Sequence, residues 1–195
     1  SNVANVNLKD NSIYIYSKNA GTVNNVTNLT ATGTVGNNYG IYSAGQVTNT
    51  GNMNFTSGKG NVGIGANTLY SNTGGMYNVA VGENSLYHTV SGIGNVAVGT
   101  DALFRNTTGA NNTAIGYNTL YNNTTGSSNV ANGFGALYSN TVGHRNMALG
   151  HFALYSNTSG NNNMAFGTEA LKANTTGENN IALGTTSLTS NIGGN

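Results

Sequence analysis

The chain has 195 residues, a net charge of +1 and only 6% charged residues, so it lacks the dense basic surface that binding to nucleic-acid phosphates requires. The absence of cysteine excludes disulfides and thiolate metal sites. No apolar run approaches the length of about 18 residues expected of a membrane-spanning helix. The length suits one domain or one elongated repeat body.

Residues 1–59 are irregular and rich in Asn, Thr and Gly. Asn11-Ser12-Ile13-Tyr14-Ile15-Tyr16 alternates polar and apolar side chains and predicts a strand, and Tyr39-Gly40-Ile41-Tyr42 is similar to it. No proline-rich or charged linker separates this segment from the rest of the chain. We therefore predict an N-terminal β cap, or irregular β-solenoid segment, over residues 1–59 that continues at Gly60.

Residues 60–195 consist of eight copies of a 17-residue repeat. Each copy opens on the motif Asn-x-small-x-Gly, in which x is apolar except at Thr113 and Asn132, as in Asn95-Val96-Ala97-Val98-Gly99. The opening asparagines are Asn61, Asn78, Asn95, Asn112, Asn129, Asn146, Asn163 and Asn180. The repeat is shorter than a helical hairpin of about 33–47 residues, and it suits one coil of two short strands and two turns. We predict an all-β fold, a parallel β-roll or β-solenoid of eight 17-residue coils.

In such a fold, equivalent side chains stack on neighbouring coils about 4.8 Å apart. Stacked asparagines are then expected to hydrogen-bond from coil to coil. A leucine column runs from Leu69 to Leu188. Beside it stands an aromatic column of Tyr70, Tyr87, Phe104, Tyr121, Tyr138 and Tyr155. Two interpretations of the aromatic column stay open, a packed ladder and an exposed adhesive stripe.

The two apolar positions of the strand form columns whose location decides the assembly. If the alanine and leucine columns fill a thin coil, the larger columns lie outside and need burial against other chains, as in a homotrimer. If the larger columns point inward, a flat alanine face is exposed, and the sequence permits both arrangements. The trimer-core candidates are Val62, Ile64, Val79, Val81, Val96, Val98, Ile115, Val130, Asn132, Met147, Leu149, Met164, Phe166, Ile181 and Leu183. At a three-fold axis, the three Asn132 amides are expected to hold a water or an anion.

The strand motif, in Asn95-Val96-Ala97-Val98-Gly99 and Asn180-Ile181-Ala182-Leu183-Gly184, resembles the Asn-Ser-Val-Ala-Ile-Gly motif of YadA-like heads. These heads are left-handed parallel β-rolls of trimeric autotransporter adhesins, in which the two apolar residues face the trimer core. The resemblance covers residues 60–195, and the longer turn here departs from many members of the family. It implies a bacterial outer-membrane surface protein whose only membrane contact is a C-terminal anchor, which we expect to follow this sequence.

No constellation of residues predicts catalysis, and we expect neither an enzyme nor a cofactor or metal site. The five acidic residues form no pair in one column of adjacent coils, and the serines lack a partnered His and Asp. The positions after the strand glycine vary, and three of them carry large aromatic residues on adjacent coils. The receptor-binding candidates are Tyr117, Phe134 and Phe152, with His144 and Arg145 as a polar rim.

We therefore expect a homotrimeric adhesin head that binds a host cell-surface protein. Similarity of the Gly-Ile-Tyr and Asn-Thr-Gly segments to fusobacterial autotransporter passengers suggests a narrower partner, an immunoglobulin-like domain of a carcinoembryonic-antigen-related cell adhesion molecule (CEACAM). One alternative is a structural trimeric segment of a phage tail fibre, because similar repeats precede self-cleaving chaperone domains there. A remote alternative is a monomeric ice-binding β-solenoid, suggested by the column of Thr73, Thr107, Thr124, Thr141, Thr158 and Thr175.

Overall fold

The structure is a computed structural model that describes residues 7–9, 12–14, 40–41 and 60–194. Contacts divide the chain into two units, Ser1–Val35 and Gly36–Asn195. In the first unit, β1 (Asn7–Lys9) and β2 (Ser12–Tyr14) pair antiparallel, and β2 falls inside the predicted strand. Most of the predicted cap over residues 1–59 lies outside the described residues, so its boundary at Gly60 stays a prediction.

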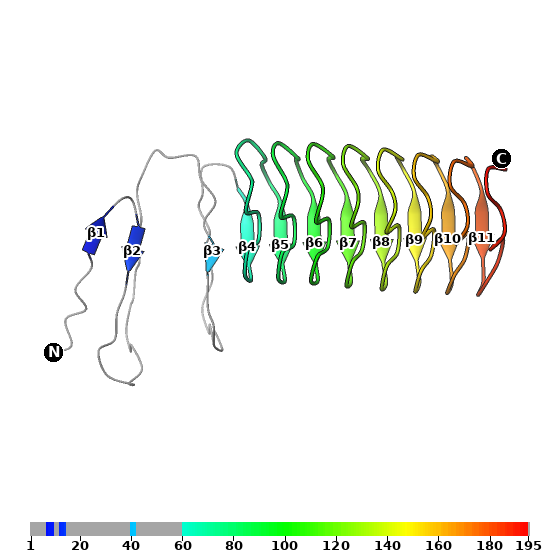
Figure 1. Cartoon of the computed structure of the whole chain (residues 1–195), viewed down its shortest axis with the longest axis horizontal. Coiled ribbons are helices and arrows are strands. Elements are labelled where there is room, and N and C mark those ends of the chain that lie inside the picture. Colours follow the sequence, from blue (N-terminus) through cyan, green and yellow to red (C-terminus); the bar gives the residue numbers. More distant parts are fainter. Residues whose placement is uncertain (1–6, 10–11, 15–39, 42–59, 195) are drawn as a thin grey trace, which may run out of the picture. The chain divides into compact units, whose positions relative to one another are not determined.

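The second unit contains one continuous parallel sheet whose strands follow one another in sequence order. Strand β3 (Gly40–Ile41) pairs with the first repeat, aligning Gly40 with Gly63 and Ile41 with Ile64. The repeats supply β4 (Val62–Ile64), β5 (Val79–Val81), β6 (Val96–Val98), β7 (Thr113–Ile115), β8 (Val130–Asn132), β9 (Met147–Leu149), β10 (Met164–Phe166) and β11 (Ile181–Leu183). Figure 1 shows β4 to β11 side by side, one per coil. The predicted all-β solenoid is confirmed, and no helix occurs among the described residues.

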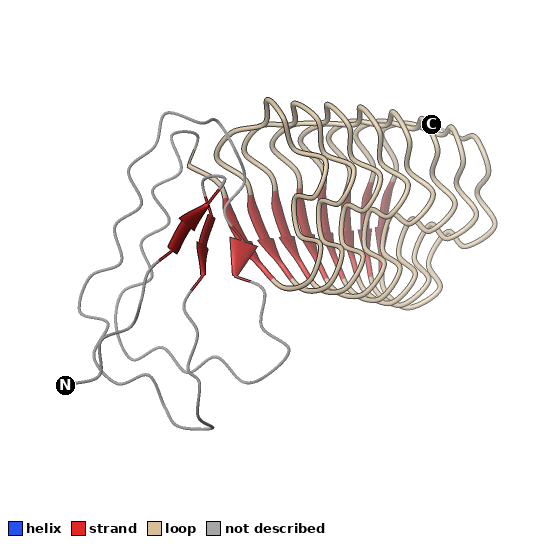
Figure 2. Ribbon diagram, turned by 60° about the vertical axis from the view of Figure 1, so that its left-hand side comes forward, coloured by secondary structure: helices blue, strands red, loops and turns tan. Residues whose placement is uncertain are grey.

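Each coil contains one strand of three residues, and the predicted second strand is absent from residues 60–194 (Figure 2). The cause is the backbone after the strand, where Asp101 and Leu103 have φ angles of 57° and 52°. Such left-handed residues cannot belong to a β-strand, which needs a strongly negative φ. Hydrogen bonds nevertheless continue from coil to coil there, as from the Leu103 N–H to the Thr119 carbonyl at 3.0 Å.

The glycine that ends each strand from β4 to β10 is required by close contact between coils. Gly99 has a φ of 133°, and a Cβ atom placed on it would lie 2.5 Å from the carbonyl oxygen of Gly116. Only glycine has both the conformational freedom and the space for this position. The constant length of the repeat keeps one such glycine above the next.

The interior of the solenoid is formed by small and leucine side chains. The middle residue of each strand from β5 to β10, an alanine, is completely buried, and so is the leucine column from Leu86 to Leu171. The two larger strand columns face outward. Of the two arrangements that the sequence permits, the chain therefore adopts the one with alanine inside.

Two ladders of buried asparagines complete the core. In the first, the Asn95 side-chain amide donates to Asn78 Oδ1 at 3.0 Å and to the Gly109 carbonyl at 2.8 Å. The Asn95 backbone N–H also donates to Asn78 Oδ1, at 2.9 Å. These bonds satisfy polar atoms that have no access to water, as burial demands. The predicted asparagine ladder is confirmed, and a second one runs through Asn106, Asn123, Asn140, Asn157 and Asn174.

Candidate binding surfaces

The outer face of the sheet is an apolar strip with no partner in the single chain. Val98 is 36% exposed and Ile115 is 40% exposed, and in the last coil Ile181 and Leu183 reach 70% and 79%. The trimer-core candidates stand in two rows along this face because the parallel register aligns each residue with its equivalent one repeat away. Asn132 lies in the second row, between Ile115 and Leu149, and is exposed.

The aromatic column forms a stacked ladder on the turn side of the coils. Neighbouring rings from Tyr70 to Tyr155 have centroids 4.9–5.2 Å apart and are nearly parallel. Stacking uses the ring faces, so the ladder packs between coils as the first interpretation expected. Tyr70 is 65% exposed at one end, whereas the rings from Tyr87 to Tyr155 are half-buried. The ring edges still reach solvent, and the interpretation as an adhesive stripe stays a prediction.

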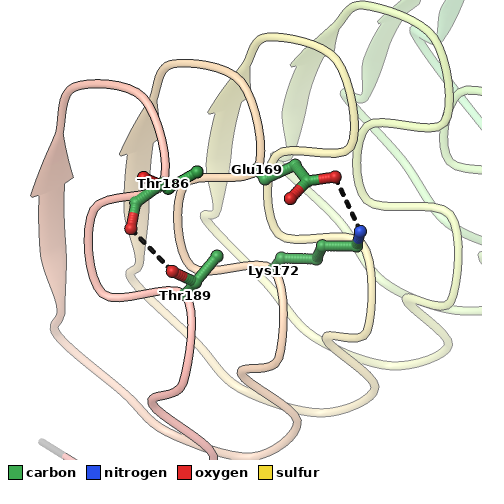
Figure 3. Close-up of polar contacts among 4 residues, drawn as sticks. All are labelled: Glu169, Lys172, Thr186 and Thr189. Atoms are coloured by element: carbon green, nitrogen blue, oxygen red, sulfur yellow. Dashed lines mark hydrogen bonds and ion pairs between the residues drawn. The ribbon is translucent and has the colours of Figure 1, made fainter.

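The ladder ends where its column changes to Lys172 and Thr189 (Figure 3). Lys172 forms an ion pair with Glu169 at 2.8 Å, and its ammonium group lies 5.3 Å from the centre of the Phe152 ring. In the last coil, the Thr189 hydroxyl donates to the Thr186 carbonyl at 2.6 Å. In the last two coils, the positions of Glu169 and Lys172 and of Thr186 and Thr189 are equivalent. They contact each other through charged groups in the first pair and polar groups in the second.

Tyr117, Phe134 and Phe152 form one aromatic patch, as their spacing in the sequence suggested. The Tyr117 and Phe134 rings stack with centroids 5.5 Å apart, and both side chains are nearly half exposed. Phe134 also contacts His151 at 5.3 Å and the edge of Phe152 at 5.2 Å. Phe152 meets Tyr155 at 4.9 Å, which joins the patch to the ladder.

Phe152 has room in the patch because the equivalent residue of the preceding coil is Gly135. A Cβ atom on Gly135 would lie 2.7 Å from the Phe152 ring. The preceding coils have Asn84, Asp101 and Asn118 at this position. The combination of a glycine and, one repeat later, a phenylalanine is the signal that would have predicted this contact from the sequence.

His144 and Arg145 lie in a different place from the aromatic patch. Strand β9 separates Arg145 from the turn that carries His151 and Phe152. Both residues line a hollow of about 470 Å³ together with Ser127, Ser128, Asn161, Asn162 and Glu178. No ring contact or hydrogen bond among the described residues links His144 or Arg145 to the aromatic patch. Their predicted role as its rim stays a prediction without a supporting contact.

The threonine column that suggested ice binding is engaged within the fold. The Thr107 hydroxyl donates to the Thr124 carbonyl, and Thr124 donates to Thr141 in the same way, each at 3.0 Å. Thr141 and Thr158 repeat the pattern. These hydroxyl protons are therefore occupied by coil-to-coil bonds, which argues against a free hydroxyl lattice that matches ice.

Within the parts of the chain that the structure describes, no three His, Asp or Glu side chains gather as metal ligands. The same parts contain no helix with the length and apolar character needed to cross a membrane. Comparison of the chain with protein-family models, curated protein sequences and solved structures found no match.

Proposed function

We propose that this chain is the head of a homotrimeric, non-enzymatic adhesin on the bacterial outer surface, which binds a protein receptor of a host cell. The observation that supports it best is the apolar strip on the outer face of β4 to β11. A strip of this length is unusual on a soluble monomer because its contact with water is unfavourable. Three copies that share the strip remove it from water and display three receptor sites, so a weak contact gains avidity.

The aromatic patch of Tyr117, Phe134 and Phe152 is the proposed receptor site. Its rings are held by contacts to one another and to the ladder, so binding orders few side chains and loses little entropy. Large aromatic residues are the side chains that most often dominate protein interfaces. By the resemblance of the repeats to YadA-like heads and of the Gly-Ile-Tyr and Asn-Thr-Gly segments to fusobacterial passengers, the partner is an immunoglobulin-like CEACAM domain.

Light scattering coupled to size exclusion tests the assembly. We expect a mass about three times the 19.9 kDa of one chain. Replacing Ile115 with aspartate on the outer face should shift the mass toward one chain, because three carboxylates would crowd one axis. A mass near 19.9 kDa for the unchanged protein would contradict the trimer.

Binding of the trimer to an immobilised CEACAM immunoglobulin-like domain tests the receptor. We expect the double variant Tyr117→Thr/Phe134→Thr to weaken binding about tenfold or more, as loss of hot-spot rings does. Thr100 and Thr168 occupy the equivalent position of other coils, so the fold should tolerate threonine at 117 and 134. The control Tyr70→Thr removes a more exposed ring outside the patch and should leave the Kd unchanged. A trimer that does not bind this receptor would contradict the receptor assignment and favour the phage tail-fibre alternative, which shares the three-chain body.

A further inference from the structure

The hollow beside β8 to β10 is built from two rows of polar side chains on successive coils. The inner row contains Ser127, His144, Asn161 and Glu178, and the outer row contains Ser128, Arg145 and Asn162. Equivalent residues in such rows stand about 4.8 Å apart. In the first three coils the inner row is instead apolar, with Met76, Ile93 and Ala110. The volume of about 470 Å³ falls in the usual range of small-molecule sites.

A chain of hydrogen bonds orients the inner row. The Ala110 N–H donates to the Ser127 hydroxyl at 3.0 Å, the Ser127 N–H donates to His144 Nδ1 at 3.0 Å, and the His144 N–H donates to Asn161 Oδ1 at 2.8 Å. Because Nδ1 of neutral His144 accepts a hydrogen bond, its ring proton is on Nε2. No described residue accepts a bond from Nε2, so this donor is left for a ligand.

Arg145 adds a charged donor. Residues 60–194 contain three cationic side chains, of which Arg105 lies over the Tyr121 ring at 5.7 Å and Lys172 pairs with Glu169. The exposed Arg145 guanidinium has no such partner among the described residues, and only its backbone N–H is bonded, to the Ser127 carbonyl. A guanidinium with free donors binds a carboxylate through two parallel hydrogen bonds. The Ser128 hydroxyl and the Asn162 amide add neutral donors on either side.

The far end of the hollow has a different character. Glu178 lies two coils beyond His144, and its Oε1 accepts a bond from the Asn161 amide at 2.7 Å. The Glu178 carboxylate repels a ligand that carries negative charge along its whole length. The same carboxylate accepts hydrogen bonds from the hydroxyl groups of a ligand. No Tyr or Phe ring is among the residues that line the hollow, so its recognition depends mainly on hydrogen bonds and charge.

We infer that this hollow binds an acidic monosaccharide, with the sugar carboxylate at Arg145, Ser128 and His144 Nε2–H and the sugar hydroxyls toward Asn161 and Glu178. A sugar acid carries one carboxylate and several hydroxyls, which matches donors at one end and an acceptor at the other. Sialic acids and uronic acids share this chemistry. The site is separate from the aromatic patch and does not depend on the proposed receptor.

Saturation-transfer NMR on the whole protein tests this inference, with the methyl glycosides of N-acetylneuraminic acid and glucuronic acid as probes and methyl galactoside as the neutral control. At about 10 mM sugar, well above a Kd of about 1 mM, we expect transfer to one or both acids and none to the galactoside. The acid that responds identifies the source of the carboxylate.

Two arginine variants localise the signal. Arg145→Asn should weaken binding of the acids about tenfold, which at about 10 mM sugar lowers the transfer about twofold, while Arg105→Gln, which removes the same charge elsewhere, should leave it unchanged. Asparagine is the matched replacement because Asn111, Asn162 and Asn179 occupy the same row with the same left-handed φ. Tyr117→Thr/Phe134→Thr should retain sugar binding even if it loses the receptor. No transfer to either acid, equal transfer to the galactoside, or an unchanged signal in Arg145→Asn would each overturn the inference.

Discussion

Thr89 interrupts the second asparagine ladder. Every other described repeat has asparagine at this position, where, for example, the Asn123 amide donates to Asn106 Oδ1 at 2.8 Å. The buried Thr89 hydroxyl has no hydrogen-bond partner. A buried polar atom without a partner costs about 1–3 kcal/mol of stability, because its bond to water is lost without replacement.

We therefore expect Thr89→Asn to raise the free energy of unfolding by about 1–2 kcal/mol, since the new amide would bond to the asparagines above and below it. Urea unfolding followed by circular dichroism measures the change. Thr89→Val keeps the shape and removes the unpaired hydroxyl, so its stability should lie between those of the two proteins. A Thr89→Asn protein that unfolds at lower urea than the parent would contradict this account.

Tyr138 sits inside the stacked ladder, between Tyr121 and Tyr155 at centroid distances of 5.2 and 5.1 Å. Burial raises the pKa of the Tyr138 phenol above its ordinary value of about 10, and the negative charges that Tyr155 and Tyr121 acquire on ionisation raise it further. In the unfolded chain this phenol loses its proton near pH 10, whereas in the folded chain it keeps the proton to higher pH.

The stability contribution of Tyr138 is therefore complete below about pH 10 and is lost as the pH rises through its raised pKa. Tyrosinate absorbance during an alkaline titration should show one late-ionising phenol that is missing from Tyr138→Phe. The variant should also lose stability less steeply than the parent above about pH 10. If the two titration curves differed only by one tyrosine that ionises near pH 10, the raised pKa of Tyr138 would be contradicted.

At the scale of the strand, β7 has an inner and an outer face that should respond differently to a substitution by valine. Ala114 is completely buried, so Ala114→Val should overpack the interior and lower the free energy of unfolding by about 1–3 kcal/mol. Thr113, its neighbour on the outer face, aligns with Val96 and Val130, so Thr113→Val should be neutral or stabilising. Thermal unfolding of the two variants measures the contrast, and equal losses in both would mean that the faces are assigned wrongly.

The strands were predictable because their motif alternates between a small residue on the inner face and larger residues on the outer face. Ala97 between Val96 and Val98 alternates with period two, and Gly99 marks the end of the strand. The second half of the coil was predicted wrongly as a strand because Leu103 adopts a left-handed φ of 52°. Leucine carries no local signal for that conformation, which normally costs it about 1–2 kcal/mol, so the packing of the buried leucine column and the coil-to-coil hydrogen bonds of its backbone must stabilise it.

The candidate surfaces were predictable to the extent that they follow the repeat. Tyr117 and Phe134 are 17 residues apart, so their stacking follows from the period. Whether the alanine column faced inward was not decidable, because both arrangements satisfy the alternation. The separation of Arg145 from Phe134 depends on how the chain turns at each end of the strand, and the period carries no information about that.

At the scale of the whole molecule, Asn132 reports on self-association because it is the one amide in its row of the apolar strip. In a single chain it is exposed, and Asn132→Val should change stability little. If three copies meet along this face, the three amides are buried among apolar neighbours such as Ile115 and Leu149, and their burial costs free energy unless they find partners.

We therefore expect Asn132→Val to stabilise the trimer by about 1–3 kcal/mol per chain, and to raise an unfolding midpoint that itself rises with protein concentration. Thermal unfolding over a wide range of concentrations measures both effects. Asn111→Ser is the control, because Asn111 is exposed and serine already occupies its row at Ser128, so its midpoint should match that of the parent. A midpoint that is independent of concentration in the parent and unchanged in Asn132→Val would place this face in solvent. The apolar strip would then need a partner other than a second copy of the chain, since its exposed valines, isoleucines and leucines would otherwise remain in water.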